Sequence, residues 1–139
     1  MTPFAVDTAP FIYLWERHLR YFQLSETLFR RLKEPDVQGI TSVITLIEAC
    51  VYPQRQGRPE LVQAYERALL QSQQVRMLPI DAVLARRAVV LRAQYNIHIP
   101  DALQIAAAIE ARATLFVTND RRVSNVDDIR VLLFDDYVT

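Results

Sequence analysis

Short apolar segments rich in β-branched residues alternate along the chain with longer segments whose apolar residues recur at helical spacing. The strand-like segments are residues 3–7, 37–43, 75–80, 114–120 and 129–134. The helix-like segments are residues 12–32, 44–52, 59–72, 82–96 and 99–112. Strands that alternate with helices predict a mostly parallel sheet, covered by helices on both sides and joined by right-handed crossovers. The expected fold class is therefore α/β, in a single domain without internal repeats or linkers.

Turn-forming residues predict where several of these elements begin and end. Residues 12–32 are expected to form two helices or one kinked helix, which stops before Pro35. Pro53 and the Arg-Gln-Gly-Arg-Pro turn at residues 55–59 are expected to end the short helix that follows the second strand. Asp81 is expected to cap the fourth helix-like segment, because its side chain can accept from the free N–H groups of a first turn.

Composition places the chain among ordinary soluble globular proteins. Its 139 residues are 51% hydrophobic and 23% charged, and this length is typical of one domain. Cys50 is the only cysteine, so it cannot form an internal disulfide and is expected to be a small buried hydrophobic residue. No apolar run is long enough to span a bilayer, and the first residues lack the pattern of a signal peptide. We therefore expect a cytoplasmic protein.

The charge balance gives no sign of a generally basic, nucleic-acid-coating protein. Basic and acidic residues number 16 each, so no overall positive field attracts phosphates. Lys33 is the only lysine, and all other Lys-or-Arg positions are arginines. Arginine is the better bidentate phosphate ligand, which weakly favours an anionic partner, but a GC-rich genome also enriches arginine. Both explanations stay open.

Four acidic residues fall at positions that a parallel sheet brings to one edge. Asp7 ends the first predicted strand, and Asp120 ends the fourth. Glu48 lies in the first turns of the helix after the second strand, and Asp101 starts an alanine-rich helix that can approach the sheet closely. Ligands of open parallel sheets bind at the carboxyl ends of the strands, where the following helices begin. We therefore expect these carboxylates to meet in one cleft.

Each of these acids also has an ordinary structural explanation. Asp7 and Asp101 stand where an acid caps a helix or suits the positive end of its dipole. Thr45 and Glu48 have the spacing of a capping box, and Asp120 can be a turn residue. Taken singly, these explanations stay open. Acids from four distant segments at one edge are nevertheless harder to explain as independent caps.

A cluster of buried carboxylates needs a cation. Like charges repel one another, and burial without compensation raises their pKa values and costs stability. Oxygen ligands without a Cys or His cluster favour Mg²⁺ or Mn²⁺ over zinc. Mg²⁺ keeps several waters and binds a few carboxylates together with substrate phosphate. The chemistry expected of this site is therefore hydrolysis of a phosphate ester.

Four segments match, in order, the sequence pattern of a known family. They are FAVDT at residues 4–8, S-x-x-T-x-x-E at Ser42, Thr45 and Glu48, IPDALQIAAAI at residues 99–109, and LFVTND at residues 115–120. In this order the segments resemble the PIN-domain family, and in particular the VapC toxins, the ribonuclease half of bacterial toxin–antitoxin pairs. Because they extend over nearly the whole chain, the resemblance implies a single three-layer α/β/α PIN-like domain over residues 1–139, with a mostly parallel central sheet.

The resemblance also implies a catalytic site of four residues. Asp7, Glu48, Asp101 and Asp120 resemble the family's acidic quartet, which holds Mg²⁺ or Mn²⁺ and carries catalysis. The implied activity is endoribonuclease cleavage of RNA phosphodiester bonds, leaving a 5′-phosphate and a 3′-hydroxyl. A metal-bound water attacks the phosphate in such a reaction, so no protein nucleophile is needed. The sequence shows no Ser-His-Asp or Cys-His constellation, which agrees with this expectation.

Supporting roles are implied for neighbouring residues. Thr8 and Thr118 would hydrogen-bond to the carboxylates or to metal-bound waters, and Asn119 would orient Asp120 or contact a phosphate. The family pattern usually has a basic residue shortly before the third acid, where this chain has His98. His98 is therefore either an RNA contact or simply a surface residue.

Several other residues also have alternative interpretations. Arg121 and Arg122 directly follow Asp120 and are the best-placed side chains to hold RNA phosphates, although a solvated charge pair explains them equally well. The large rings within residues 11–22 can belong to the core, to a groove or to a dimer surface. The remaining C-terminal aspartates are assigned to turns and a solvated tail, and they are Asp127, Asp128, Asp135 and Asp136. Asp127 or Asp128 could still add an outer-sphere contact at the metal site, if the strand that follows lies beside the strand that ends at Asp120.

The resemblance further implies a homodimer and a cognate antitoxin protein that blocks the active site, with no role for a membrane. The alternative is a non-catalytic PIN-like module that binds RNA or protein without cleavage; the presence of all four acids weighs against it, and the neutral net charge keeps it open. Two other acid-based folds fit less well. A phosphoacceptor receiver domain needs a lysine at a later strand end, whereas Lys33 lies in a predicted helix, and an aspartyl phosphatase needs an acid where this chain has Ala9.

Overall fold

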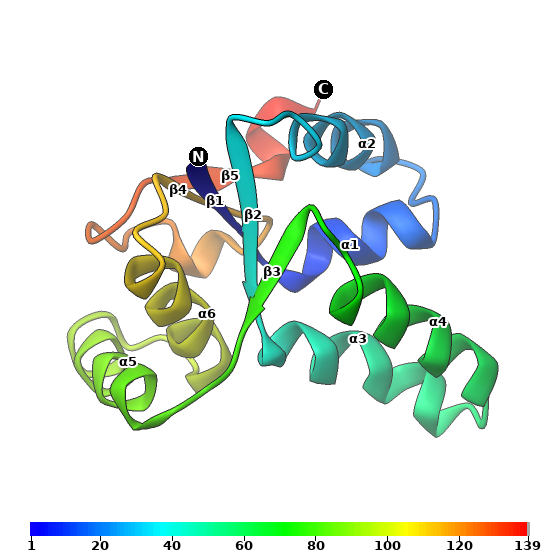
Figure 1. The fold of residues 1–139 in the computed structure, drawn as a ribbon. Coiled ribbons are helices and arrows are strands. Elements are labelled where there is room, and N and C mark those ends of the chain that lie inside the picture. The colour runs from blue at the N-terminus through cyan, green and yellow to red at the C-terminus, as the bar shows by residue number, and fades with distance from the viewer. Residues whose placement is uncertain (139) are drawn as a thin grey trace.

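The computed structural model describes residues 1–138 and contains one five-stranded sheet with helices on both faces (Figure 1). The strands are β1 (Thr2–Val6), β2 (Val37–Ser42), β3 (Val75–Leu78), β4 (Leu115–Thr118) and β5 (Val131–Leu133). Their order in the sheet is β3-β2-β1-β4-β5, and every neighbouring pair is parallel. The prediction of a parallel α/β fold is confirmed.

Six α-helices cover this sheet as two outer layers. They are α1 (Thr8–Trp15), α2 (Phe22–Arg31), α3 (Val43–Arg55), α4 (Pro59–Leu70), α5 (Ala82–Tyr95) and α6 (Ile99–Glu110). Two short 3₁₀ helices, η1 (Arg121–Val123) and η2 (Phe134–Tyr137), follow β4 and β5. Helices α5 and α6 lie on one face of the sheet, and α1 to α4 lie on the other (Figure 1). The molecule is therefore a three-layer α/β/α sandwich.

Alternating side chains of the strands build one core on each face. Ala5 packs in the core under α5 and α6, whereas its neighbour Val6 packs in the core under α1 to α4. This alternation is the two-residue period of a strand that is covered on both sides. The alanines of α6 are fully buried, and Ala102, Ala106 and Ala108 have no exposed surface. Their small side chains bring the N-terminus of α6, with Asp101, close to the sheet.

The expected end of the helix after β2 is correct for the turn and wrong for Pro53. Helix α3 ends at Arg55, where the turn begins, and Pro53 is buried inside it. Proline removes only its own N–H group, and the next turn closes through later donors. The backbone N–H groups of Gln56 and Arg58 donate to the carbonyls of Tyr52 and Pro53. The expected break within residues 12–32 is confirmed, since α1 and α2 are separate helices.

None of the helices within residues 1–138 combines the length and apolar character that crossing a membrane requires.

Candidate active site

The strand order brings the four predicted acids to one cleft at the carboxyl edge of the sheet. Asp7 directly follows β1, and Asp120 follows the neighbouring strand β4. Glu48 extends from α3, and Asp101 lies in the first turn of α6. All four side chains line the same cleft of about 380 Å³, together with part of α1. Segments more than a hundred residues apart therefore meet as the sequence predicted.

Asp7 is the most buried of these carboxylates, and three donors hold it. Its Oδ1 accepts from the backbone N–H of Thr8 at 2.8 Å and from Nε2 of Gln104 at 3.3 Å. Its Oδ2 accepts from the hydroxyl of Thr118 at 2.7 Å. Burial raises the pKa of Asp7, while the hydrogen bonds from Thr118 and Thr8 lower it and the negative charge of Asp120 raises it further. The carboxylate is thus fixed in position but short of positive charge.

Gln104 orients this cluster and was missed by the sequence analysis. Its side chain is 3% exposed, and Nε2 donates to Thr45 Oγ1 at 2.8 Å. Its Oε1 accepts from the hydroxyl of Ser42 at 2.7 Å. The direction of the other hydrogen bonds follows because each hydroxyl has only one proton to donate. Thr41 donates its proton to the carbonyl of Val6, so in the contact between the two threonines Thr45 donates to Thr41. Thr45 therefore accepts from Gln104. The amide therefore presents its donor end to Asp7.

Glu48 is held by a threonine side chain and does not belong to a capping box. The hydroxyl of Thr8 donates to Glu48 Oε1 at 2.6 Å. The N-cap of α3 is Ser42, whose hydroxyl accepts from the backbone N–H of Ile44, so Thr45 lies inside the helix. Burial raises the pKa of Glu48, and the charge of Asp7 adds to this effect. The capping-box explanation of Thr45 and Glu48 is wrong.

Asp101 is ionised at a clear electrostatic cost in the cleft. Burial raises its pKa to about 6, with further contributions from the charges of Asp7, Asp120 and Glu48. The N-cap of α6 is His98, so Asp101 does not cap this helix, although its place in the first turn suits the positive end of the helix dipole. No hydrogen-bond donor reaches its carboxylate from residues 1–138. A cation bound beside Asp101 would offset the free-energy cost of its negative charge.

Asp120 differs from the other three acids because an arginine already neutralises it. Arg122 donates from Nε to Oδ1 at 3.0 Å and from Nη2 to Oδ2 at 2.8 Å. This hydrogen-bonded pair holds the pKa of Asp120 below its usual value. The backbone N–H of Arg122 also donates to Asp120, which caps η1, so the turn explanation holds as well. Arg121 instead pairs with Asp136, and His98 is exposed.

Asn119 points away from Asp120. Its Nδ2 donates to the hydroxyl of Tyr13 at 3.0 Å, and its Oδ1 accepts from the backbone N–H of Asp135 at 2.9 Å. Both ends of the amide are therefore used in tying α1 to the segment after β5. Asp135 is exposed, as expected, but its carboxylate also accepts from the hydroxyl of Tyr21 at 2.6 Å.

The carboxylate oxygens of the cleft are chemically suited to bind a hard divalent cation, although those of Asp7, Glu48 and Asp120 accept hydrogen bonds from other protein groups. The cleft offers carboxylate oxygens, and the pKa values of Asp7, Glu48 and Asp101 are raised by burial. These are the ligands that Mg²⁺ and Mn²⁺ prefer. Within residues 1–138, however, no group of three or more His, Cys, Asp or Glu side chains is arranged closely enough to hold a metal ion as it stands. To bind an ion here, the carboxylates would have to replace hydrogen bonds from protein groups with bonds to the metal.

Fold and cleft together define an α/β protein with a carboxylate-lined site. The PIN domain family model matches residues 4–129, and the chain belongs to this family. No match is found among curated proteins.

Solved structures of toxin–antitoxin proteins share the fold. A toxin–antitoxin complex from Klebsiella pneumoniae is 21% identical, with a TM-score of 0.71, and the match covers 96% of this chain and 98% of that one. VapBC-1 from nontypeable Haemophilus influenzae is 16% identical, with a TM-score of 0.72 and coverage of 96% and 99%. A VapC toxin of Mycobacterium tuberculosis that cleaves the sarcin–ricin loop is 19% identical, with a TM-score of 0.66 and coverage of 81% and 86%.

Proposed function

We propose that the chain is a Mg²⁺- or Mn²⁺-dependent endoribonuclease and the toxin of a type II toxin–antitoxin pair. The observation that carries this proposal is the meeting of Asp7, Glu48, Asp101 and Asp120 in one cleft of a PIN domain. Structural relatives support it, since one of them cleaves the sarcin–ricin loop and others are toxin–antitoxin complexes. RNA is the substrate that this likeness favours.

The protein's own residues prepare the cleft for a phosphate group. Thr118, Gln104 and the N–H of Thr8 position the carboxylate of Asp7 in the cleft, where it would exchange one of these hydrogen bonds for a bond to the metal. Asp7, Glu48, Asp101 and Asp120 would hold the dication, which supplies Lewis-acid polarisation of the phosphate and a water of lowered pKa. Arg122 then becomes free to hold a phosphate of the RNA when it leaves Asp120.

The test is cleavage of structured RNAs by the purified protein with Mg²⁺, with Mn²⁺ and with EDTA. We expect cleavage that needs the metal and is lost in Asp7→Asn and Asp101→Asn. Glu110→Gln is the matched control, because Glu110 ends the same helix as Asp101 but pairs with Arg87 on the surface. Cleavage that continues in EDTA or in both aspartate variants would overturn the metal mechanism. RNA binding without cleavage in either metal would favour the non-catalytic alternative.

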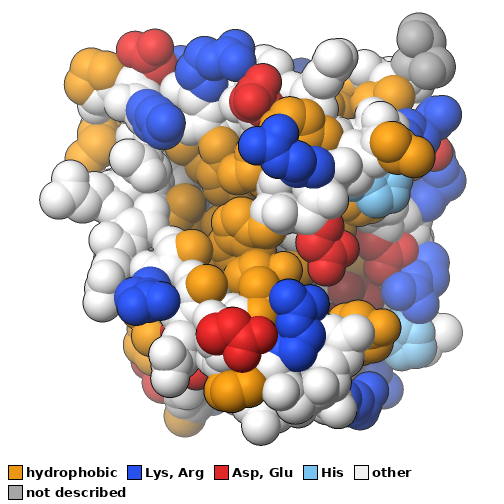
Figure 2. Space-filling model, turned by 90° about the vertical axis from the view of Figure 1, so that its right-hand side faces the viewer, with side chains coloured by type: hydrophobic (Ala, Val, Ile, Leu, Met, Phe, Trp, Pro, Cys, Tyr) orange, Lys and Arg blue, Asp and Glu red, His pale blue; other side chains and the backbone are white. Residues whose placement is uncertain are grey.

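An antitoxin partner is proposed for the apolar hollow beside α1. Figure 2 shows hydrophobic side chains lining this hollow, with Lys and Arg side chains at its rim and acidic side chains to one side. Phe11, Trp15 and Phe29 line it, with Glu26, Arg30 and Lys33 at its polar positions, where Glu26 pairs with Arg30. Helix α1 lines both this hollow and the acidic cleft. A partner with an apolar segment and acidic flanks, seated here, reaches the cleft along α1.

A homodimer is proposed through α5 and the start of α6. Val83, Val89 and Val90 on α5 and Ile99 on α6 are between 51% and 67% exposed. Val89 and Ile99 line one hollow of this surface and Val83 and Val90 line another, and exposed apolar residues of this kind are typical of a protein interface. We expect light scattering to give the mass of a dimer for the wild type and of a monomer for Val89→Glu. A monomeric wild type at micromolar concentration would refute this interface.

A further inference from the structure

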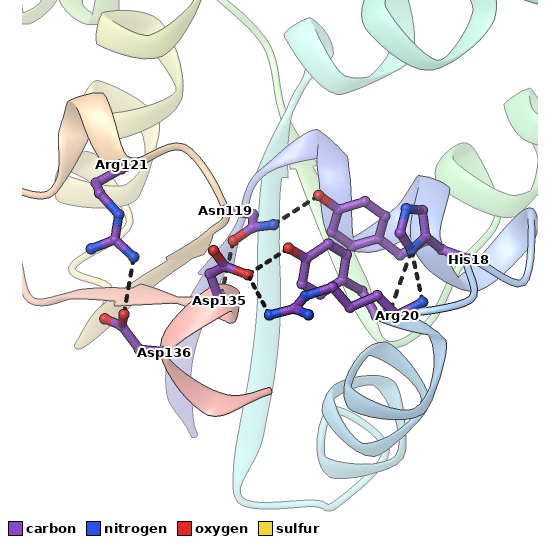
Figure 3. Close-up of polar contacts among 8 residues, drawn as sticks. His18, Arg20, Asn119, Arg121, Asp135 and Asp136 are labelled. Carbon is purple, nitrogen blue, oxygen red and sulfur yellow. Dashed lines mark hydrogen bonds and ion pairs between the residues drawn. The ribbon is translucent and has the colours of Figure 1, made fainter. Parts of the chain in front are cut away.

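Three aromatic rings gather beside the acidic cleft, where α1 leads into α2 (Figure 3). Tyr13 belongs to α1, Tyr21 is the N-cap of α2, and His18 lies between them. We call these three side chains the ring platform. Tyr13 and Tyr21 are stacked with centroids 4.6 Å apart, and His18 stacks on Tyr21 at 5.0 Å. Phe134, which is 1% exposed, lies 6.0 Å from Tyr13 and supports the platform from the core.

Hydrogen bonds hold the tyrosines of the platform in place. The hydroxyl of Tyr21 donates to Asp135, and the hydroxyl of Tyr13 accepts from Asn119. Asn119 in turn accepts from the backbone of Asp135, so α1, α2, β4 and η2 are linked through two side chains (Figure 3). A platform fixed in this way loses little conformational freedom when it binds a ligand.

His18 is held at one edge, stacks on Tyr21 and remains exposed to solvent. Its Nδ1 accepts from the backbone N–H groups of Arg20 and Tyr21 at 3.1 and 3.3 Å (Figure 3). Neutral His18 therefore carries its proton on Nε2, which lies on the edge away from this turn. His18 and Arg20 are exposed, whereas Tyr13 and Tyr21 are half-buried. The guanidinium of Arg20 lies over the Tyr21 ring at 5.6 Å. The outer parts of the cluster are thus an imidazole ring and a guanidinium plane.

The ring platform and the acidic cleft share a residue. Tyr13 lines the cleft with Asp7 and Asp120, and it also stacks in the platform. Asn119, which holds Tyr13, is the residue before Asp120. A nucleotide whose phosphate lies in the cleft therefore has its neighbouring base within reach of the platform.

We propose that the ring platform is a base-stacking subsite for an unpaired base of the substrate RNA, next to the scissile phosphate. Imidazole rings and guanidinium planes are the groups on which proteins stack unpaired bases. His18 and Arg20 offer both groups, and an ion pair with Asp135 at 3.3 Å holds the guanidinium of Arg20 beside the platform. The inference rests on the proposed ribonuclease function and adds to it a preference for single-stranded RNA at one position.

The experiment measures binding separately from cleavage. Asp7→Asn protein in EDTA is titrated into a fluorescein-labelled single-stranded RNA octamer, and affinity is read from anisotropy. A second octamer carries one abasic position, and a third carries 2-aminopurine, whose fluorescence falls when it stacks. His18→Asn is the main variant, because the asparagine oxygen can replace Nδ1 as acceptor for the turn while the ring is lost. Tyr52→Leu is the control, since it removes a 62% exposed ring on α3.

We expect His18→Asn to weaken binding of the intact octamer by about tenfold and to reduce quenching of 2-aminopurine. The abasic octamer should bind the parent protein and His18→Asn with the same affinity, because the base that stacks is missing. His18→Phe should retain most of the affinity, since it keeps a ring. Unchanged affinity and unchanged quenching in His18→Asn would overturn the subsite, and would leave the platform as a surface for protein contacts.

Failure of the subsite and failure of the proposed function give different results. Ring-dependent RNA binding without metal-dependent cleavage by the wild-type protein supports the subsite and refutes the nuclease. Metal-dependent cleavage with ring-independent RNA binding supports the nuclease and refutes the subsite. Equal melting temperatures of the parent protein and His18→Asn, within about 2 °C, show that the turn is intact in the variant.

Discussion

Asp101→Asn is expected to make the metal-free protein more stable at neutral pH. The pKa of Asp101 is raised from 3.8 to about 6 by burial and by the neighbouring acids. At 1.36 kcal/mol per pKa unit, full transmission of this shift costs the folded state about 3 kcal/mol. The side chain is half-buried, so solvent screening reduces the cost, and we expect about 1.5 kcal/mol. Asparagine removes the charge and hence the cost.

The direction of the pKa shift determines the pH range in which Asp101 destabilises the folded protein. The folded-state pKa lies above the unfolded value, so Asp101 destabilises the folded protein only where it is ionised. Its contribution is absent below about pH 3.8, grows as the pH rises from about 4 to about 6, and is constant above that range. The gain in Asp101→Asn should therefore be about 1.5 kcal/mol at pH 7 and a few tenths at pH 4.

Urea denaturation in EDTA at pH 4 and pH 7 measures this difference, and thermal melting at pH 7 should show a rise of about 5 °C. Glu60→Gln is the control, because Glu60 is a first-turn acid of α4 with an exposed side chain and no neighbouring acidic cleft. Saturating Mn²⁺ should stabilise the wild type and not Asp101→Asn. A gain of the same size at both pH values, or none at pH 7, would refute the electrostatic reasoning.

Three more predictions concern residues around the cleft and the sheet. Arg122→Gln should bind Mn²⁺ up to about fivefold more tightly in calorimetry, because a partly exposed ion pair worth about 1 kcal/mol no longer competes for Asp120; weaker binding would contradict this competition. Gln104→Leu should lower the free energy of unfolding by about 1–3 kcal/mol in urea, since buried hydroxyls lose their partner; a neutral effect would show that Gln104 does not hold the network. Gly39→Ala should cost about 1–3 kcal/mol in the same assay, because a Cβ there meets the carbonyl oxygen of Gln74 at 2.7 Å; full wild-type stability would mean that β2 and β3 separate freely.

The sequence predicted the elements well because their signals are local. Strands and helices follow from periodicity, and strand-to-helix turns place Asp7 and Asp120 at the carboxyl edge whatever the details of packing. Pro53 failed as a helix end because its cost depends on whether the surrounding turn is held by tertiary packing. The residues next to Pro53 in the sequence do not reveal that packing.

The contacts that complete the cleft depend on tertiary structure. Gln104 gave one signal in the sequence, since it is the only polar residue between Ala102 and Ile109, at helical spacing from Asp101. Its partners come from β2 and α3, and only the fold shows them. Asp135 was expected in a solvated tail, yet Tyr21 lies more than a hundred residues away and donates to it. A contact between residues so far apart in the sequence leaves no local pattern from which it could be predicted.

Capping and metal binding were posed as alternatives for the acids, and the geometry shows why they are compatible. A carboxylate has two oxygens with several acceptor positions, so Asp7 accepts from the first N–H of α1 on one oxygen and from Thr118 on the other. Asp120 likewise caps η1 and binds Arg122. Capping therefore explains the position of these two acids without removing their charge from the cleft. Glu48 and Asp101 cap no helix, and an account based on local structure leaves their repulsion unexplained, so substitution of these two residues distinguishes most sharply between a cation site and a set of helix ends.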